Sequence, residues 1–80
     1  MAKIKNWKIV TSIRNIWGQE IRRDYRNIKS ETDVIISTFM KNLWYVDIID
    51  ITGRRLGGKK FKTKTQALNY ARKWMKTHRL

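Results

Sequence analysis

Lysine and arginine side chains are the residues of this chain best suited to binding chemistry. The 80 residues include 19 Lys and Arg against 6 Asp and Glu, a net charge of +13, and residues 51–80 contribute ten basic groups and no acidic one. A compact domain with this excess repels itself, and a polyanion relieves the repulsion. Cationic side chains also neutralise phosphates and release counterions, which gives affinity independent of base sequence. The candidate phosphate-binding residues are Arg22, Arg23, Arg26, Arg54, Arg55, Lys59, Lys60, Lys62, Arg72, Lys73 and Lys76.

Aromatic rings beside these cations are the second candidate group. Side chains alternate between the two faces of a strand, so strands at residues 19–28 and 44–51 would place Tyr25 and Tyr45 on the sheet face opposite the core, next to Arg and Lys. Trp17 falls in a turn. Exposed rings among cations can stack on unpaired bases of DNA or RNA. The other large rings are predicted to fill the core, as expected for a small domain. They are Trp7, Phe39, Trp44, Phe61 and Trp74.

The sequence shows no constellation typical of an enzyme or of a metal protein. It has no cysteine and a single histidine, His78, which we expect in the last turn of a helix, where a cation interacts favourably with the carbonyl end. Asp47 and Asp50 have an odd spacing on a strand and so face opposite sides. Glu20 and Asp24 are expected to pair with nearby arginines at the surface, for little net energy. We therefore predict no catalytic residue, no metal and no cofactor.

The elements that position these residues are clearest in the second half of the chain. Residues 44–51 are β-branched and aromatic, as is typical of a strand, and Thr52-Gly53 turns the chain towards a returning strand at 59–62. Thr63 and Gln66 have the spacing of a capping box. A helix should follow, because apolar residues recur there at intervals of three and four. Its buried face is predicted to hold Ala67, Leu68, Ala71, Trp74, Met75 and His78.

The first half resembles a degenerate copy of the second. Strands are expected at residues 7–14 and 19–28, joined by a turn at Asn15–Gly18. Residues 15–21 match residues 50–56 in pattern, and residues 28–35 match residues 61–68, which predicts a helix over 33–42 and one supersecondary unit built twice. β-branched residues oppose that helix. The core of such a domain would contain Trp7, Ile9, Ile13, Trp44, Val46, Ile48, Leu68, Ala71 and Met75.

The predicted fold is therefore α+β, with tandem strand–strand–helix (ββαββα) units in one domain, residues 1–80. The units cover residues 7–42 and 43–80, residues 1–6 form a mobile lead-in, and the strands make a small antiparallel sheet with the helices on one face. An alternative reading starts from the helical spacing of apolar residues in 12–28 and makes residues 33–40 a strand, which gives the order αβββα.

Two family resemblances follow from these readings. The αβββα order, with a Gly-containing hairpin before a basic last helix, resembles the double-stranded RNA-binding domain, although Lys62 and Lys64 flank a Thr where that family has adjacent lysines. The strand–strand–helix pattern is similar to the arm-type DNA-binding domains of tyrosine integrases, over about half the chain. The residues that carry this second likeness are Trp44, Gly53, Phe61, Thr63, Ala67, Leu68 and Ala71.

The sequence thus predicts a non-enzymatic nucleic-acid-binding module that favours DNA over RNA and makes mainly phosphate contacts, with low sequence selectivity. The alternatives are a module that docks an acidic protein partner and a domain like those that bind double-stranded RNA. No membrane partner is expected. The chain is predicted to be a monomer, or a homodimer through an open sheet edge, in the cytoplasm or on the nucleoid.

Overall fold

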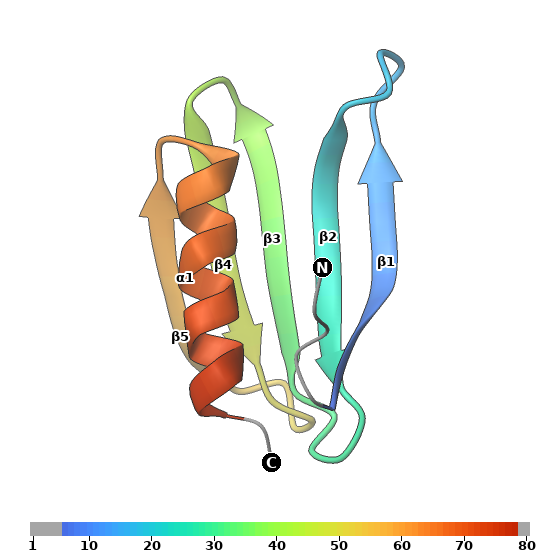
Figure 1. Cartoon of the computed structure of the whole chain (residues 1–80), viewed down its shortest axis with the longest axis vertical. Coiled ribbons are helices and arrows are strands. Elements are labelled where there is room, and N and C mark those ends of the chain that lie inside the picture. The colour runs from blue at the N-terminus through green and yellow to red at the C-terminus, as the bar shows by residue number, and fades with distance from the viewer. Residues whose placement is uncertain (1–5, 79–80) are drawn as a thin grey trace.

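A five-stranded antiparallel sheet and one helix make up residues 6–78, which are the residues that the computed structural model describes. The strands follow one another across the sheet in chain order, so each consecutive pair forms a hairpin (Figure 1). The elements in order are β1 (Trp7–Arg14), β2 (Glu20–Asn27), β3 (Asp33–Met40), β4 (Leu43–Ile49), β5 (Arg55–Phe61) and α1 (Lys64–Thr77). The domain is α+β, and β1 and β5 are the two edges of the sheet.

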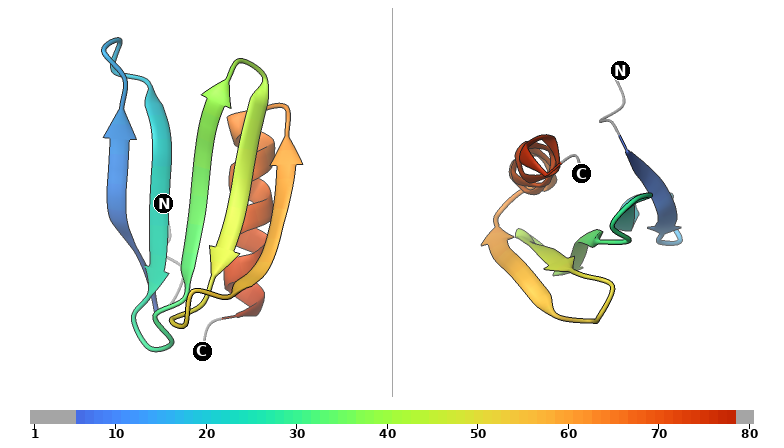
Figure 2. Two further views of the ribbon diagram at one scale, coloured as in Figure 1. Left: turned by 180° about the vertical axis from the view of Figure 1, so that it is seen from behind. Right: turned by 90° about the horizontal axis from the view of Figure 1, so that it is seen from below.

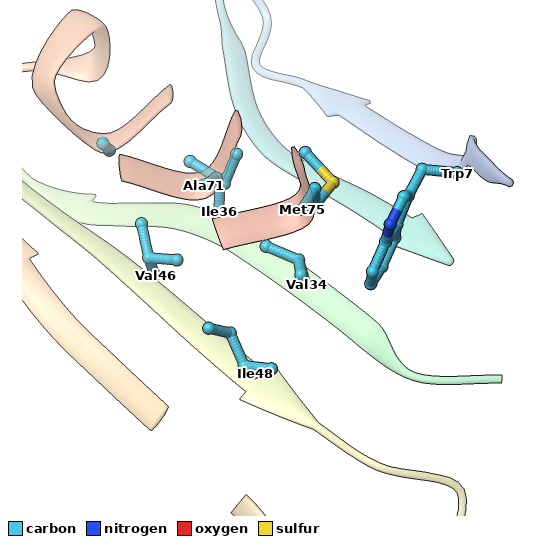
Figure 3. Close-up of a cluster of buried hydrophobic side chains, with 8 residues drawn as sticks. Trp7, Val34, Ile36, Val46, Ile48, Ala71 and Met75 are labelled. Atoms are coloured by element: carbon cyan, nitrogen blue, oxygen red, sulfur yellow. The ribbon is translucent and has the colours of Figure 1, made fainter. Parts of the chain in front are cut away.

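The core lies between the helix and strands β3 and β4. On β3 and β4 the buried residues alternate, and cross-strand pairing places Val34 opposite Ile48 and Ile36 opposite Val46. The helix presents Ala67, Ala71 and Met75, all fully buried, to this surface. Two alanines in the contact let the helix backbone approach the sheet closely, and Figure 3 shows Met75 above the β3 side chains, beside Trp7.

The sheet curves around α1, which lies over β3, β4 and β5 (Figure 2). We call the sheet face under the helix the inner face and the opposite one the outer face. Three contacts tie the first hairpin to the helix and its C-cap. Trp7 meets Trp74 edge-on at 6.0 Å and its indole N–H donates to the His78 carbonyl at 3.2 Å, while Glu20 pairs with Lys64 at 3.0 Å.

The helix begins where the sequence predicts. Thr63 is the N-cap, and its hydroxyl accepts from the Gln66 backbone N–H at 3.2 Å. The Gln66 side chain accepts from the backbone N–H of Lys62 at 3.3 Å. In the standard capping box the donor would be the backbone N–H of the N-cap residue, Thr63, which is one residue later. The strands predicted in both hairpins are also present, with ends that differ by a few residues.

The predicted ββαββα architecture is wrong, because residues 33–40 form the central strand β3 and not a helix. β3 pairs with β2 on one side and with β4 on the other, so β-branched Val34, Ile35 and Ile36 occupy the position that suits them. The alternative αβββα order places this strand correctly but is wrong for residues 12–28, which belong to β1 and β2. The resemblance to the double-stranded RNA-binding domain depends on that order and fails with it.

The apparent repeat is a repeated turn, and not a repeated unit. At Asn15, the side-chain oxygen accepts from the backbone N–H groups of Trp17 and Gln19, both at 3.0 Å, and Asp50 does the same for Thr52 and Arg54 at 3.0 and 2.9 Å. Each turn also contains a glycine at positive φ, 79° at Gly18 and 87° at Gly53. The second sequence match has no structural counterpart, because residues 28–32 connect two strands whereas residues 61–65 run from the end of β5 into the start of the helix.

Several predicted core positions are also corrected. The register shifts between Ile9 and Thr11, so Ile13 pairs with Arg22 on the outer face and is 43% exposed. Ile9 stays on the inner face but lies beyond the helix and is 52% exposed. Phe39 is 82% exposed near the β3–β4 turn. The prediction for Tyr25 is wrong in the opposite sense. Tyr25 was expected on the outer face, but it pairs with Val34 on the inner face and packs against the core.

The predicted mobile lead-in falls almost entirely outside residues 6–78. Of its residues only Asn6 is described, and its carbonyl accepts from the Ile28 backbone N–H at 2.8 Å.

Candidate nucleic-acid interface

Arginines on the outer face are matched by carboxylates. Arg22 and Asp24 lie two residues apart on β2, whereas the other two pairs join neighbouring strands or turns. The three pairs are Arg22–Asp24 at 2.9 Å, Arg26–Asp33 at 2.8 Å and Arg55–Asp47 at 2.8 Å. Arg22 donates hydrogen bonds to Asp24, and Arg26 donates them to Asp33, which raises the pKa of both arginines. These exposed pairs add little stability, but each carboxylate offsets a charge that the sequence assigns to phosphate binding.

A glycine makes room for the third pair. The Arg55 guanidinium lies against the backbone of Gly58, which pairs with Asp47 across the sheet, and a Cβ at Gly58 would collide with it. Gly58 therefore leaves the space that the Arg55–Asp47 ion pair occupies.

Arg23 and Tyr25 point to the inner face. The Arg23 guanidinium donates to the Tyr25 hydroxyl at 3.0 Å and pairs with Glu20 at 2.7 Å, and Glu20 is nearly buried. Burial alone would raise the pKa of Glu20, but hydrogen bonds from Ser12, Arg23 and Lys64 outweigh it and lower the pKa to about 2. This buried ionic cluster joins the first hairpin to the start of α1 and is not placed to meet an external polyanion.

An open groove runs between the edge strand β5 and the helix α1. We call it the β5–α1 groove, and its lining contains four lysines and, among the residues that the structure describes, no carboxylate. Its lining residues are Asn42, Leu43, Lys59, Lys60, Phe61, Lys62, Gln66, Asn69, Tyr70 and Lys73. The groove thus combines uncancelled positive charge with amide groups and two aromatic rings.

The two elements supply the lining through their own periodicities. Along the edge strand and the residue after it, Lys59, Lys60 and Lys62 are all exposed, and β5 has no sixth strand beyond it within residues 6–78. On the helix, Gln66, Asn69, Tyr70 and Lys73 occur at positions i, i+3, i+4 and i+7, which forms one stripe beside the buried alanines.

Aromatic rings fix the position of Lys59 within the groove. Phe61 and Tyr70 meet at 5.3 Å between ring centroids, and Lys59 Nζ lies 5.7 and 5.8 Å from the two centroids. A cation over two ring faces is held by the ring quadrupoles and still exposes its N–H donors. Lys60 lies on the other side of β5, with its Nζ 5.8 Å from the Tyr45 ring.

The structure therefore divides the predicted site residues. Lys59, Lys60, Lys62 and Lys73 come together, and Tyr45 adjoins them on the outer face as predicted. Arg54 lies in the β4–β5 turn, at the end of β5 opposite to Lys60 and Lys62. Arg72 and Lys76 lie on α1 outside the groove lining. Gln66 and Tyr70 are not among the predicted binding residues, although their helical spacing with Lys73 is a usable signal.

His78 ends the helix as its C-cap. Its ring stacks on Trp74 at 3.8 Å, and its Nδ1 lies 2.8 Å from both the Trp74 carbonyl and the Thr77 hydroxyl. Within residues 6–78 no group of three or more His, Asp or Glu side chains could hold a metal ion. The helix in that range is not long and apolar enough to span a membrane.

Comparison of the chain with known protein families, with curated proteins and with solved structures found no significant match. The function is therefore argued from the geometry of the groove.

Proposed function

We propose that this protein is a non-enzymatic nucleic-acid-binding module, with DNA as its preferred ligand, and that the β5–α1 groove binds the phosphate backbone. The observation that carries the proposal is the groove lining, with four lysines and no carboxylate among the described residues. Three outer-face arginines, in contrast, share their charge with aspartates at 2.8–2.9 Å. The proposed interface therefore contains fewer basic residues than the sequence predicted.

A polymer suits this groove better than a single small anion does. Its lysines come from a strand, from the segment after it and from a helix, so they line an extended surface and do not converge on one point. A chain of phosphates can contact them in succession and release several counterions. Lysine is a flexible point charge without the bidentate geometry of arginine, so low sequence selectivity is expected. The cytoplasm or the nucleoid is the corresponding location.

Salt dependence with charge-matched variants tests the proposal. We would measure the affinity for one DNA oligonucleotide, single-stranded and as a duplex, by fluorescence anisotropy over a series of NaCl concentrations. The Lys59→Gln/Lys73→Gln variant and the Arg22→Gln/Arg26→Gln variant each remove two positive charges. The groove variant should weaken binding and flatten the slope of log K against log [salt] by about 1.5, at roughly 0.7–0.9 for each lost phosphate contact.

The control variant should keep most of the wild-type slope. Equal effects of the two variants would contradict a role for the groove. No salt-dependent binding of either DNA form by the wild type would refute the proposed function itself.

The free edge of β1 favours a second candidate, a protein-interaction module. This strand leaves Ile9, Val10 and Ile13 partly exposed beside a sheet edge that no other strand of residues 6–78 pairs with, where another chain could add a strand. At Val10 the register of β1 against β2 shifts, between Ile9 and Thr11. A concentration-dependent dimer in sedimentation velocity, abolished by Val10→Pro, would support it, and a monomer at all concentrations would exclude self-association through β1.

A further inference from the structure

Phe39 is the feature that the phosphate-binding proposal leaves unexplained. Its side chain is 82% exposed, although burial of a phenylalanine side chain is favourable. It lies at the end of β3, 6.0 Å from the Tyr45 ring on β4, and the two rings are tilted by 54°. The outer face therefore carries an exposed Phe39 ring beside the half-buried Tyr45 ring at the β3–β4 end of the sheet.

This ring pair continues into the β5–α1 groove. Tyr45 is the cross-strand partner of Lys60, whose Nζ lies 5.8 Å from the Tyr45 ring. Lys60 also lines the groove. A second, smaller depression on the outer side of β5 is lined by Tyr45, Asp47, Arg55, Gly58, Lys59 and Lys60. The lysines of β5 thus connect the groove on one side of the edge strand with the aromatic rings on the other.

We propose that the ligand of the groove is single-stranded nucleic acid, whose backbone follows the β5 lysines while an unpaired base stacks on Phe39 beside Tyr45. This inference rests on the proposed function and specifies its substrate class. A base offers its ring face to a protein side chain only when it is unpaired and unstacked, whereas duplex bases present only their edges. Stacking is tolerant of base identity, which agrees with the low selectivity expected from lysine contacts.

A set of ring variants tests the inference. The probes are fluorescein-labelled oligothymidylate and its duplex with oligoadenylate, at one fixed salt concentration. Phe39→Ser should weaken oligothymidylate binding about fivefold or more, at roughly 1–3 kcal/mol per stacked base, and change duplex binding less than about twofold. Phe39→Trp should retain the wild-type affinity, because it keeps a ring face.

Trp17→Ser is the matched control. Trp17 is 78% exposed, but it lies in the β1–β2 turn, away from the groove lining, and its replacement should leave both affinities unchanged. The inference is overturned if Phe39→Ser has no effect, if it weakens the two probes equally, or if Trp17→Ser weakens oligothymidylate binding as much. Those results would leave the proposed function standing as long as the lysine variants still reduce salt-dependent binding.

Discussion

Replacing Glu20 by glutamine should destabilise the fold in a pH-dependent way. The Glu20 carboxylate accepts from the Ser12 hydroxyl at 2.5 Å and pairs with Arg23 at 2.7 Å and Lys64 at 3.0 Å, and its side chain is only 4% exposed. Glutamine keeps the size and can still accept a hydrogen bond, but it carries no charge for the two cations. The change therefore isolates the ionic part of the contact between the first hairpin and α1.

The magnitude follows from the pKa of Glu20. Its value falls from the usual 4.5 to about 2 on folding, which corresponds to roughly 3 kcal/mol at about 1.4 kcal/mol per tenfold change in proton affinity. Because the folded state has the lower pKa, this stability is fully present above about pH 4.5 and is lost as the pH falls towards 2. For a domain of this size, it also corresponds to a fall of roughly 10 °C or more in Tm.

The assay is urea unfolding followed by circular dichroism, for wild type and Glu20→Gln, at several pH values between neutrality and pH 2. The difference in free energy of unfolding should be about 2–3 kcal/mol at neutral pH and should shrink towards zero at the acid end, where Glu20 is protonated. Glu31→Gln makes the same chemical change at an exposed turn position and should have a much smaller effect. A Glu20→Gln difference that stays constant with pH would refute the ionic explanation.

Three further substitutions probe how the fold is held together. Trp7→Phe removes the indole N–H that donates to the His78 carbonyl and should lower the free energy of unfolding by about 1–2 kcal/mol in urea titrations; no change would contradict that tie. Gly53→Ala places a side chain at φ 87° and should cost about 1–2 kcal/mol, measured as a lower Tm; an unchanged Tm would contradict the need for glycine in this turn. Thr63→Ala removes the acceptor for the Gln66 N–H and should cost about 1 kcal/mol, visible as earlier loss of helical ellipticity on heating; an unchanged melting curve would contradict the cap.

The second half of the fold could be predicted because its signals are local. Thr63 caps the helix, and the spacing of Ala67, Ala71 and Met75 identifies the face that is buried. The strand around Val46 likewise alternates in the expected way. Such features depend on neighbours within about one turn of chain, so the amino-acid order alone carries them.

The identity of residues 33–40 could not be decided in that way. Ile35, Ile36, Phe39 and Met40 fit one helical face, and only pairing with strands on both sides makes the segment a strand. The match to the later helix start misled the prediction, because similar residues serve a turn between β2 and β3 in one place and a helix cap in the other. The single-residue irregularity at Val10, which moves Ile13 to the outer face, is equally invisible in the sequence.

The candidate site was predicted only as a set of basic residues with two tyrosines. Lys59, Lys60, Lys62 and Lys73 were all named, but nothing local separates them from Arg26, whose partner Asp33 lies across a strand pair. Cross-strand register decides which basic side chains pair with a carboxylate and which remain available to a ligand. Arg22 is the exception, since Asp24 two residues along the same strand must share its face.

Mapping the bound surface by NMR tests the central claim most directly. Backbone amide shifts would be recorded while oligothymidylate is titrated into the ¹⁵N-labelled protein. We expect the largest changes along β5 and on the helix stripe that includes Gln66, Tyr70 and Lys73. Changes concentrated instead on β1 and β2, around Arg22 and Arg26, would contradict the assignment of phosphate binding to the β5–α1 groove.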